Sequence, residues 1–348
     1  MQIQSASKNR ILTWLAVVVF GALAGQGYTT LTYDTIPPEI LKTWPGLRGG
    51  AVVAGLSGGF EIFVMRGVVG TWFRRQAFLV ALFIRILTHT AFVVFALLGN
   101  RASSALMIGQ IVPEAFILRE IVQDVFYAFM VVAVALFVLQ MRTLIGGRTL
   151  LNVVLGRYYR PVTEQRLFIM IDLTGSTPLA ARIGDERFHD FLSAFFFEID
   201  AAVTQFGGEV YSYIGDGVIV SWPLRDGRPN ARAVEAIFAA RERLDRRSSW
   251  FRSNFGQAPA FHAVLHGGSV VAGECGDSRR QITYLGDVLN TTARLEGLSK
   301  QLDVDCMISN DLLQQTTLPG SITATDLGQH TLKGVAAPVA VSALKIMS

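Results

Sequence analysis

Two aspartates lie where metal ions and phosphates are commonly bound. Asp172 stands near the end of the apolar run 167–173 (LFIMIDL), and residues 175–177 (GST) follow it. Asp216 lies between two glycines, further along the chain. Carboxylate oxygens are the ligands that Mg²⁺ prefers, and free backbone N–H groups at the start of a helix bind phosphate oxygens. Taken alone, a Gly-Asp-Gly sequence is typical of a simple turn, so the chemistry depends on whether the fold brings the two carboxylates together.

The surrounding sequence predicts elements that would do so. The run 167–173 reads as a buried strand, and Pro178 suits the first turn of the helix that follows. A second helix is expected over about 185–205. The β-rich runs 209–214 and 218–222 then flank the Gly-Asp-Gly sequence, which indicates a hairpin with Asp216 at its tip. The tip of such a hairpin could meet Asp172 at the end of the neighbouring strand.

Four separated motifs occur in the order expected of one known family. They are FIMIDLTGST, YIGDGVIVSW, ITYLGDVLNTTARLE and TLKGVAAPV. In these motifs the segment from about 166 to 344 resembles the class III nucleotidyl cyclases. The resemblance implies a ferredoxin-like α/β cyclase domain that acts as a head-to-tail homodimer. It also implies that ATP is converted to 3′,5′-cyclic AMP and pyrophosphate at the dimer interface, with two Mg²⁺ or Mn²⁺ ions per site.

The resemblance assigns roles to individual residues of this chain. Asn290 matches the position that orients the ribose, and Arg294 the arginine that stabilises the transition state at the α-phosphate. These two are four residues apart, which places them on one helix face. Lys333 matches the lysine that contacts the terminal phosphates. The resemblance also assigns metal binding to Asp172, Leu173 and Asp216. From their place at the start of a helix, Gly175, Ser176 and Thr177 are expected to bind the nucleotide through their backbone N–H groups.

Recognition of the base departs from the pattern of the family. Adenylate cyclases usually carry Lys four residues before the second metal aspartate, where this chain has Ser212. The usual partner of that lysine, Asp or Thr, matches Thr283. Guanylate cyclases usually carry Glu at the first position, which this chain also lacks. We expect an adenylate cyclase. The alternatives are a guanylate cyclase and a catalytically silent nucleotide-binding membrane receptor.

The N-terminal part has the composition of a membrane protein. The whole chain is 51% hydrophobic and only 17% charged. Apolar stretches at about 11–28, 47–70, 76–99 and 121–141 each approach the ~20 residues that a helix needs to cross a bilayer. The first could be a signal peptide, but the later stretches favour a retained helix. We therefore predict three parts: a transmembrane domain of four helical spans (1–141), a juxtamembrane helical linker (142–165) and the cyclase catalytic domain (166–348).

The distribution of charge predicts the location of the protein. Residues 1–160 hold 14 Lys or Arg against 6 Asp or Glu, whereas the remainder holds 17 against 21. This basic excess belongs to the membrane part, where it would meet lipid, and does not indicate nucleic-acid binding. Its distribution among the loops favours cytoplasmic termini in a multi-pass protein of the inner (plasma) membrane. The stretch 103–118 is expected to be an extracytoplasmic interfacial or re-entrant segment.

Four further features of the sequence lead to expectations, some with an alternative. Glu61 and Arg85 are expected to form an ion pair between spans; His89 shares the helix face of Arg85 and could instead serve a ligand, haem or quinone site. In the linker, Leu144, Leu151 and Tyr158 recur every seven residues, which fits either an amphipathic helix or a short parallel dimer helix. His262 and His266 are expected in the core or an interface rather than at a metal. Cys275 and Cys306 are expected to be reduced thiols.

Overall fold

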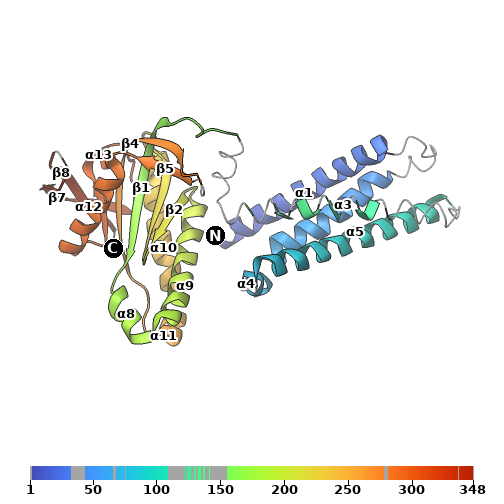
Figure 1. Ribbon diagram of the computed structural model, residues 1–348, viewed down its shortest axis with the longest axis horizontal. Helices are drawn as coiled ribbons and strands as arrows, with labels where there is room; N and C mark the ends of the chain where they lie inside the picture. The colour runs from blue at the N-terminus through green and yellow to red at the C-terminus, as the bar shows by residue number, and fades with distance from the viewer. Residues whose placement is uncertain are drawn as a thin grey trace. The chain divides into compact units, whose positions relative to one another are not determined.

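The computed structural model divides the chain into two compact units, Met1–Ile145 and Gly146–Ser348. Each unit is described by itself (Figure 1). The described residues are 2–32, 44–65, 68–74, 76–108, single positions between 122 and 141, 155–277, 281–335 and 337–347.

The first unit consists of helices in the residues described. They are α1 (Gln2–Thr32), α3 (Pro45–Gly59), the π-helical turn η1 (Phe60–Val64), α4 (Val68–Arg74) and α5 (Phe78–Ile108).

Two stretches of these helices are long and apolar enough to cross a membrane, Gly46–Val64 and Phe78–Asn100. Helix α1 includes the first predicted span, whereas the fourth, 121–141, lies largely outside the described residues. Helix α5 continues to Ile108, so the first part of the predicted interfacial stretch is helical. The prediction of four spans stays a prediction.

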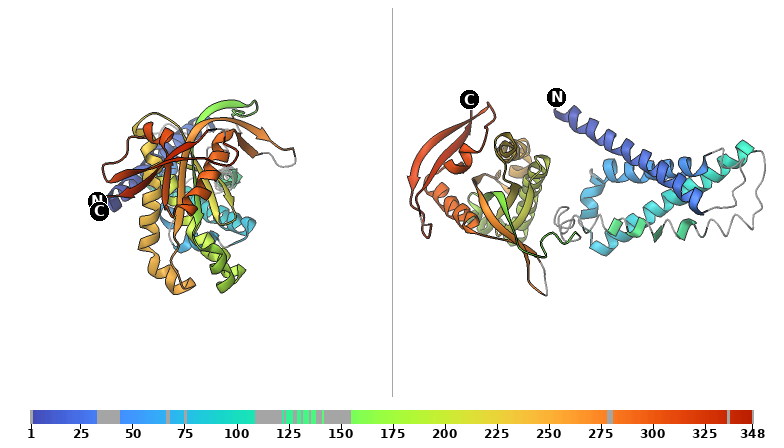
Figure 2. Two further views of the ribbon diagram at one scale, coloured as in Figure 1. Left: turned by 90° about the vertical axis from the view of Figure 1, so that its left-hand side faces the viewer. Right: turned by 90° about the horizontal axis from the view of Figure 1, so that it is seen from above.

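Glycines allow α1 and α3 to pack with their backbones in close contact. A Cβ atom at Gly50 would overlap the carbonyl oxygen of Gly21, and a Cβ atom at Gly25 would overlap that of Gly46. Each pair of glycines on one helix is spaced by four residues, the spacing of close helix contacts in membranes. Figure 2 shows the two helices side by side.

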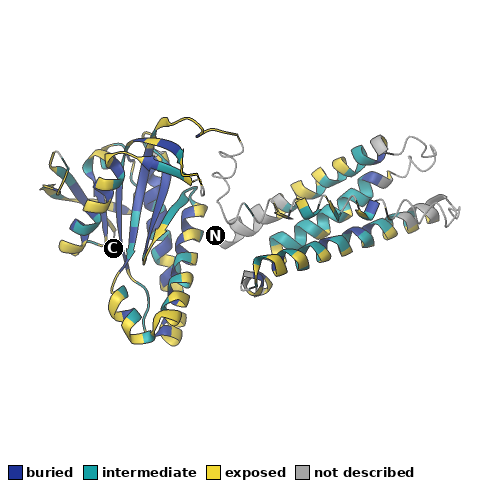
Figure 3. Cartoon of the chain, viewed as in Figure 1, coloured by how far each residue is buried: buried dark blue, intermediate teal, exposed yellow. Residues whose placement is uncertain are grey.

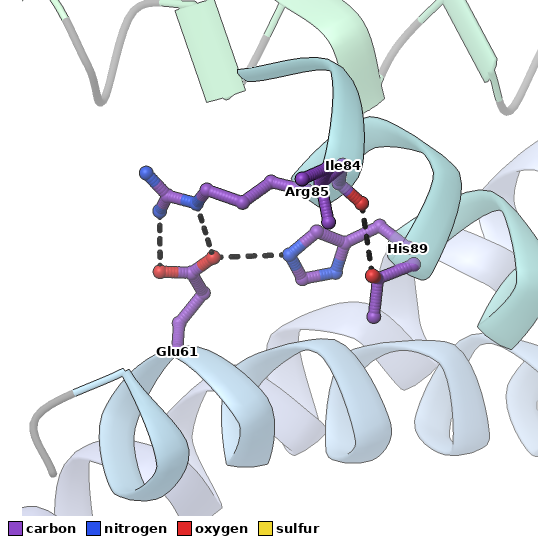
Figure 4. Close-up of polar contacts among 5 residues, drawn as sticks. Glu61, Ile84, Arg85 and His89 are labelled. Atoms are coloured by element: carbon purple, nitrogen blue, oxygen red, sulfur yellow. Dashed lines mark hydrogen bonds and ion pairs between the residues drawn. The ribbon is translucent and has the colours of Figure 1, made fainter. Parts of the chain in front are cut away.

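The predicted ion pair between Glu61 and Arg85 is confirmed (Figure 4). The guanidinium donates two hydrogen bonds to the carboxylate, with Nε at 3.2 Å and Nη2 at 2.5 Å from its oxygens. Nε2 of His89 lies 3.0 Å from Glu61 Oε1, and only 2% of His89 is exposed. Glu61 belongs to the π-helical turn, a type of turn that often occurs at functional positions. The cluster therefore joins α5 to the segment that follows α3.

A mixed β-sheet forms the centre of the second unit. Its order is β2-β3-β1-β4-β6-β8-β7, and β5 pairs with β4. The first four strands are mutually antiparallel in the order of a ferredoxin-like fold, as predicted. The strands are β1 (Val162–Leu173), β2 (Glu209–Ile214), β3 (Gly217–Pro223), β4 (Phe261–Cys275), β5 (Gln281–Leu285), β6 (Cys306–Ser309), β7 (Ile322–His330) and β8 (Val339–Ile346).

Helices cover the two faces of this sheet unequally. Alternate residues of β1, such as Leu167 and Ile169, contact the large core under α9 and α10. On the opposite face, Leu295 and Leu298 of α12 pack on Val264 in β4. Figure 3 shows the buried strands between helices whose outer surfaces are exposed. The helices are α8 (Ser176–Ile183), α9 (Asp185–Gln205), α10 (Arg228–Arg246), α11 (Ser248–Phe255), α12 (Asp287–Gln301) and α13 (Asn310–Gln314).

The end of the linker is folded into the second unit. Residues 155–160 form turns, and Tyr158 is 1% exposed within a cluster that includes Phe168. The Tyr158 hydroxyl donates to Glu164 Oε1 at 3.2 Å and accepts from Arg166 at 3.3 Å. The expectation that Tyr158 extends a linker helix is therefore wrong, because burial of its ring holds it in a turn. Leu144 and Leu151 lie outside the described residues.

Candidate active site

The fold brings the two predicted metal aspartates to one edge of the sheet. Asp172 on β1 pairs with Gly217 on β3, and Asp216 immediately precedes that glycine at the hairpin tip. A Cβ atom at position 217 would lie 3.2 Å from Asp172 Oδ1, so glycine keeps this approach open. Leu173 is buried at the end of β1, which leaves its backbone as the part able to contribute.

A cation is already present at this edge. Nζ of Lys300 lies 2.6 Å from Asp172 Oδ2 and 2.5 Å from Glu296 Oε1. Partial burial lowers the pKa of the Lys300 ammonium, but its hydrogen bonds to the two carboxylates outweigh this effect and raise the pKa overall. The oxygen donors of Asp172 and Asp216 suit a hard cation such as Mg²⁺ or Mn²⁺. The residues present therefore fit the divalent metal that was predicted.

The residues predicted to contact phosphate form the start of α8. Gly175 is the N-cap and has a positive φ of 69°, a conformation that favours glycine. No side chain caps this helix end. The backbone N–H groups of Ser176 and Thr177 thus belong to an uncapped first turn, where a phosphate oxygen would be a suitable acceptor.

Asn290 and Arg294 share the outer surface of α12. Both are exposed, whereas the neighbouring Thr291 and Leu295 are buried against the sheet. The hydroxyl of Thr292 is satisfied within the helix by the carbonyl of Val288, at 2.7 Å. The helix therefore presents Asn290 and Arg294 away from the core of its own chain.

One chain keeps Asn290 apart from the metal aspartates. Asp172 contacts Lys300, at the C-terminal end of α12. Asn290 precedes Lys300 by ten residues, and ten helical residues rise by about 15 Å. Each chain thus carries the predicted metal-binding residues and the predicted ribose-orienting residue in different places.

Ser212 and Thr283 occupy strands β2 and β5. The hydroxyl of Ser212 contacts only its neighbour's carbonyl, at 3.4 Å from Tyr213 O, among the contacts described. The Thr283 hydroxyl oxygen is buried and has no hydrogen-bond partner in the described part of the chain. The rings of the adjacent Tyr211 and Tyr284 pack with centroids 5.0 Å apart, which brings the two strands into contact.

The remaining predicted residue, Lys333, is exposed in the turn between β7 and β8. Gly334 follows it with a φ of 78°, which favours glycine in this turn. The residue missed by the sequence reasoning is Lys300. Its signal was the spacing of four residues from Glu296 on a predicted helix, which allows a Glu–Lys pair.

The histidines and cysteines of the second unit have separate surroundings. Nδ1 of His262 lies 3.2 Å from the carbonyl of Val304, and Nδ1 of His266 lies 2.8 Å from the hydroxyl of Ser309. Both cysteines are free thiols, as predicted. Burial raises the pKa of the Cys306 thiol to about 12, while the nearby Arg241 opposes this shift.

Comparisons with known proteins relate the chain to adenylate cyclases. No family model matches the sequence. Adenylate cyclase 2 of Rhizobium meliloti (strain 1021) is 38% identical over 218 residues, which make up 63% of this chain and 60% of that protein. An adenylate cyclase of Anabaena cylindrica is 25% identical over 166 residues, 46% of this chain and 32% of that protein. The chain thus spans less than two thirds of the length of either relative.

The structural comparison concerns the fold alone. A bacterial light-regulated adenylyl cyclase superposes with a TM-score of 0.52 at 18% identity, covering 63% of this chain and 64% of that one. The fold of the second unit was therefore predicted correctly from the four motifs. The two curated relatives compared above are adenylate cyclases, and the chain shares its fold with a bacterial light-regulated adenylyl cyclase.

Proposed function

We propose that the protein is a class III adenylate cyclase that forms 3′,5′-cyclic AMP and pyrophosphate from ATP in a homodimer. The observation that carries the proposal is the separation, in one chain, of the metal aspartates from the exposed Asn290 and Arg294. In a head-to-tail dimer, the metal aspartates of one chain would face Asn290 and Arg294 of the second copy, so that the two chains together form each complete site. Similarity to two curated adenylate cyclases supports this choice.

Each group of the proposed site has a separate role in the reaction. In the proposed site, Asn290 orients the ribose so that its 3′-hydroxyl faces the α-phosphate. Arg294 stabilises the negative charge that develops there in the transition state. Lys333 and the first turn of α8 bind the terminal phosphates, which depart as pyrophosphate. Asp172 and Asp216, with the backbone of Leu173, would hold two divalent metals, whose charge would favour ionisation of the 3′-hydroxyl and departure of pyrophosphate.

Selection of the base is proposed to depend on Thr283. Its buried hydroxyl lacks a partner among the described residues, so the edge of a purine would satisfy it. Ser212 is too short to replace the usual lysine and contributes at most a water-mediated contact. Adenine therefore remains the preferred base with a weaker discrimination than the family pattern implies.

The first unit is proposed to anchor the enzyme in lipid. Two apolar helical stretches in the described residues support association with a membrane. We propose a multi-pass protein of the inner (plasma) membrane with four spans, both termini and the catalytic domain being cytoplasmic. This arrangement would give the site access to cellular ATP.

The test is cyclic nucleotide formation by the purified full-length protein. ATP and GTP are supplied separately, each with Mg²⁺ or Mn²⁺. We expect cyclic AMP as the main product, and a loss of at least about 100-fold in kcat for Asp172→Ala or Asp216→Ala, because each variant removes a charged metal ligand. Asp190→Ala, an exposed position on α9, is the matched control and should retain activity.

Three results would contradict parts of the proposal. Full activity of either aspartate variant would remove the metal assignment. A complete lack of cyclic AMP and cyclic GMP from a folded, dimeric protein would favour the silent nucleotide-binding receptor. A dominant cyclic GMP product would instead support the guanylate cyclase alternative.

A further inference from the structure

Lys300 connects the metal-binding edge to the helix that carries Asn290 and Arg294. Its ammonium group bridges Asp172 on β1 and Glu296 on α12, at 2.6 and 2.5 Å. The lysine side chain is 46% exposed, whereas those of the two carboxylates are 18% and 17% exposed. The ammonium-bearing side chain is thus the most exposed of the three charged side chains in this cluster.

The ammonium and a divalent metal compete for the same carboxylate. A Mg²⁺ ion binds oxygen ligands at about 2.1 Å, so a metal on Asp172 would lie close to an ammonium that stays on that carboxylate. Two cations this near one another repel strongly in a partly buried site. A metal bound to this carboxylate would therefore weaken the pairing of Lys300 with Asp172.

Glu296 is a second carboxylate partner for the ammonium group of Lys300. It lies four residues before Lys300 on α12, a spacing at which Glu and Lys pair well on a helix surface. The ammonium can thus release Asp172 while keeping one carboxylate partner. The remainder of α12 is fixed by Leu295 and Leu298, which are buried against the sheet.

We propose that Lys300 is a displaceable counter-ion of the metal site, which neutralises Asp172 until the metal binds and then pairs with Glu296 alone. This inference rests on the proposed function, because it takes Asp172 to be a metal ligand. It also makes Lys300 a positioning residue. In a head-to-tail dimer, α12 of one chain serves the other chain's metal aspartates, so metal entry at one site releases the end of the helix that acts in the other.

Direct binding of Mn²⁺ to the full-length protein tests the exchange of cations. Free Mn²⁺ is measured by electron paramagnetic resonance without nucleotide. Lys300→Gln should bind Mn²⁺ about five- to tenfold more tightly than the unaltered protein, because no ammonium competes for Asp172. Lys300→Arg keeps the charge and should bind with nearly the original affinity. Lys345→Gln, on β8 and three strands from β1, removes the same charge elsewhere and should change little.

A second substitution should act in the opposite direction. Glu296→Gln leaves the ammonium with Asp172 as its one carboxylate partner in this cluster and also removes a nearby negative charge. Mn²⁺ binding should therefore weaken. This variant keeps the size of the side chain, so it remains informative if Lys300→Gln fails to fold. Unchanged or weaker binding by folded Lys300→Gln, or tighter binding by Glu296→Gln, would overturn the inference.

Hydrogen–deuterium exchange tests the link to α12. In the unaltered protein, Mn²⁺ should speed exchange in a peptide that spans residues 295–302, because the tie to β1 is lost. In Lys300→Gln, exchange there should be fast already and insensitive to Mn²⁺. Equal sensitivity in both proteins would refute the link.

The proposed function and this inference fail in distinguishable ways. Asp172→Asn should lose Mn²⁺ binding if Asp172 is a metal ligand at all. Retained binding in that variant would defeat the metal assignment within the proposed function. Loss of binding in Asp172→Asn, combined with no gain in Lys300→Gln, would defeat the counter-ion role alone.

Discussion

Complementation between two inactive chains offers a quantitative test of the shared site. In the proposed site, Asp172→Ala would remove the metal-binding half and Asn290→Ala the ribose-binding half. These halves are separated in one chain, because Asn290 lies about 15 Å along α12 from the residue that contacts Asp172. In a heterodimer, both lesions fall in one site and the other site is intact.

The expected activity follows from counting dimers. Equal co-expression and random pairing produce about half heterodimers, each with one intact site of two, so cyclic AMP formation should recover to about one quarter of the unaltered value. Each variant expressed alone should be inactive. The assay is cyclic AMP formation by the co-expressed pair, with two different affinity tags to isolate the heterodimers.

The matched control combines two lesions of the same half. A heterodimer of Asp172→Ala and Asp216→Ala chains has one damaged metal residue in each site, so it should recover no activity. The reasoning is refuted if isolated heterodimers of the first pair stay inactive. It is equally refuted if the control pair recovers as well, because the metal aspartates would then not work together.

Three further outcomes are expected. Ser212→Lys should raise the ratio of kcat/KM for ATP over GTP by about 10- to 100-fold, as a contact to the base edge is gained. Burial lowers the pKa of His266, although Asp311 opposes this; the unfolded chain therefore binds a proton below about pH 6.5 that the folded one does not. Stability should fall as the pH drops from 7 to 5.5, and His266→Gln should reduce that fall in Tm. Gly50→Val should destabilise the α1–α3 contact by about 1–3 kcal/mol, measured as a lower Tm in detergent, whereas Gly27→Ala, with open space around it, should not.

Local sequence patterns were sufficient to predict the centre of the second unit. The apolar run before Asp172 became β1, and the two runs around Asp216 became the hairpin of β2 and β3. A buried strand and a glycine-containing turn are determined by neighbouring residues, so their positions can be derived from the sequence. The ferredoxin-like order came from the resemblance, since strand order depends on contacts between distant segments.

The contacts that sequence reasoning missed join residues far apart in the chain. Lys300 and Asp172 are separated by 128 positions, and no periodic pattern relates a helix terminus to the end of a particular strand. Tyr158 shows the converse error. Its seven-residue spacing from Leu151 matched a helix, but burial beside Phe168 holds it in a turn. Tertiary packing overrides a short periodic pattern in such cases.

The placement of α12 explains why one chain alone does not bring all the proposed site residues together, and why Lys300 lies beside Asp172. The helix packs on the sheet through Leu295 and Leu298, which leaves its outer surface to Asn290 and Arg294 and its last turn to Lys300. In the proposed dimer, this one helix would carry residues for two different sites. Leu295 and Leu298 fix the helix between Arg294 and Lys300, so the proposed exchange of cations would loosen its C-terminal turn while Asn290 and Arg294 stay in place.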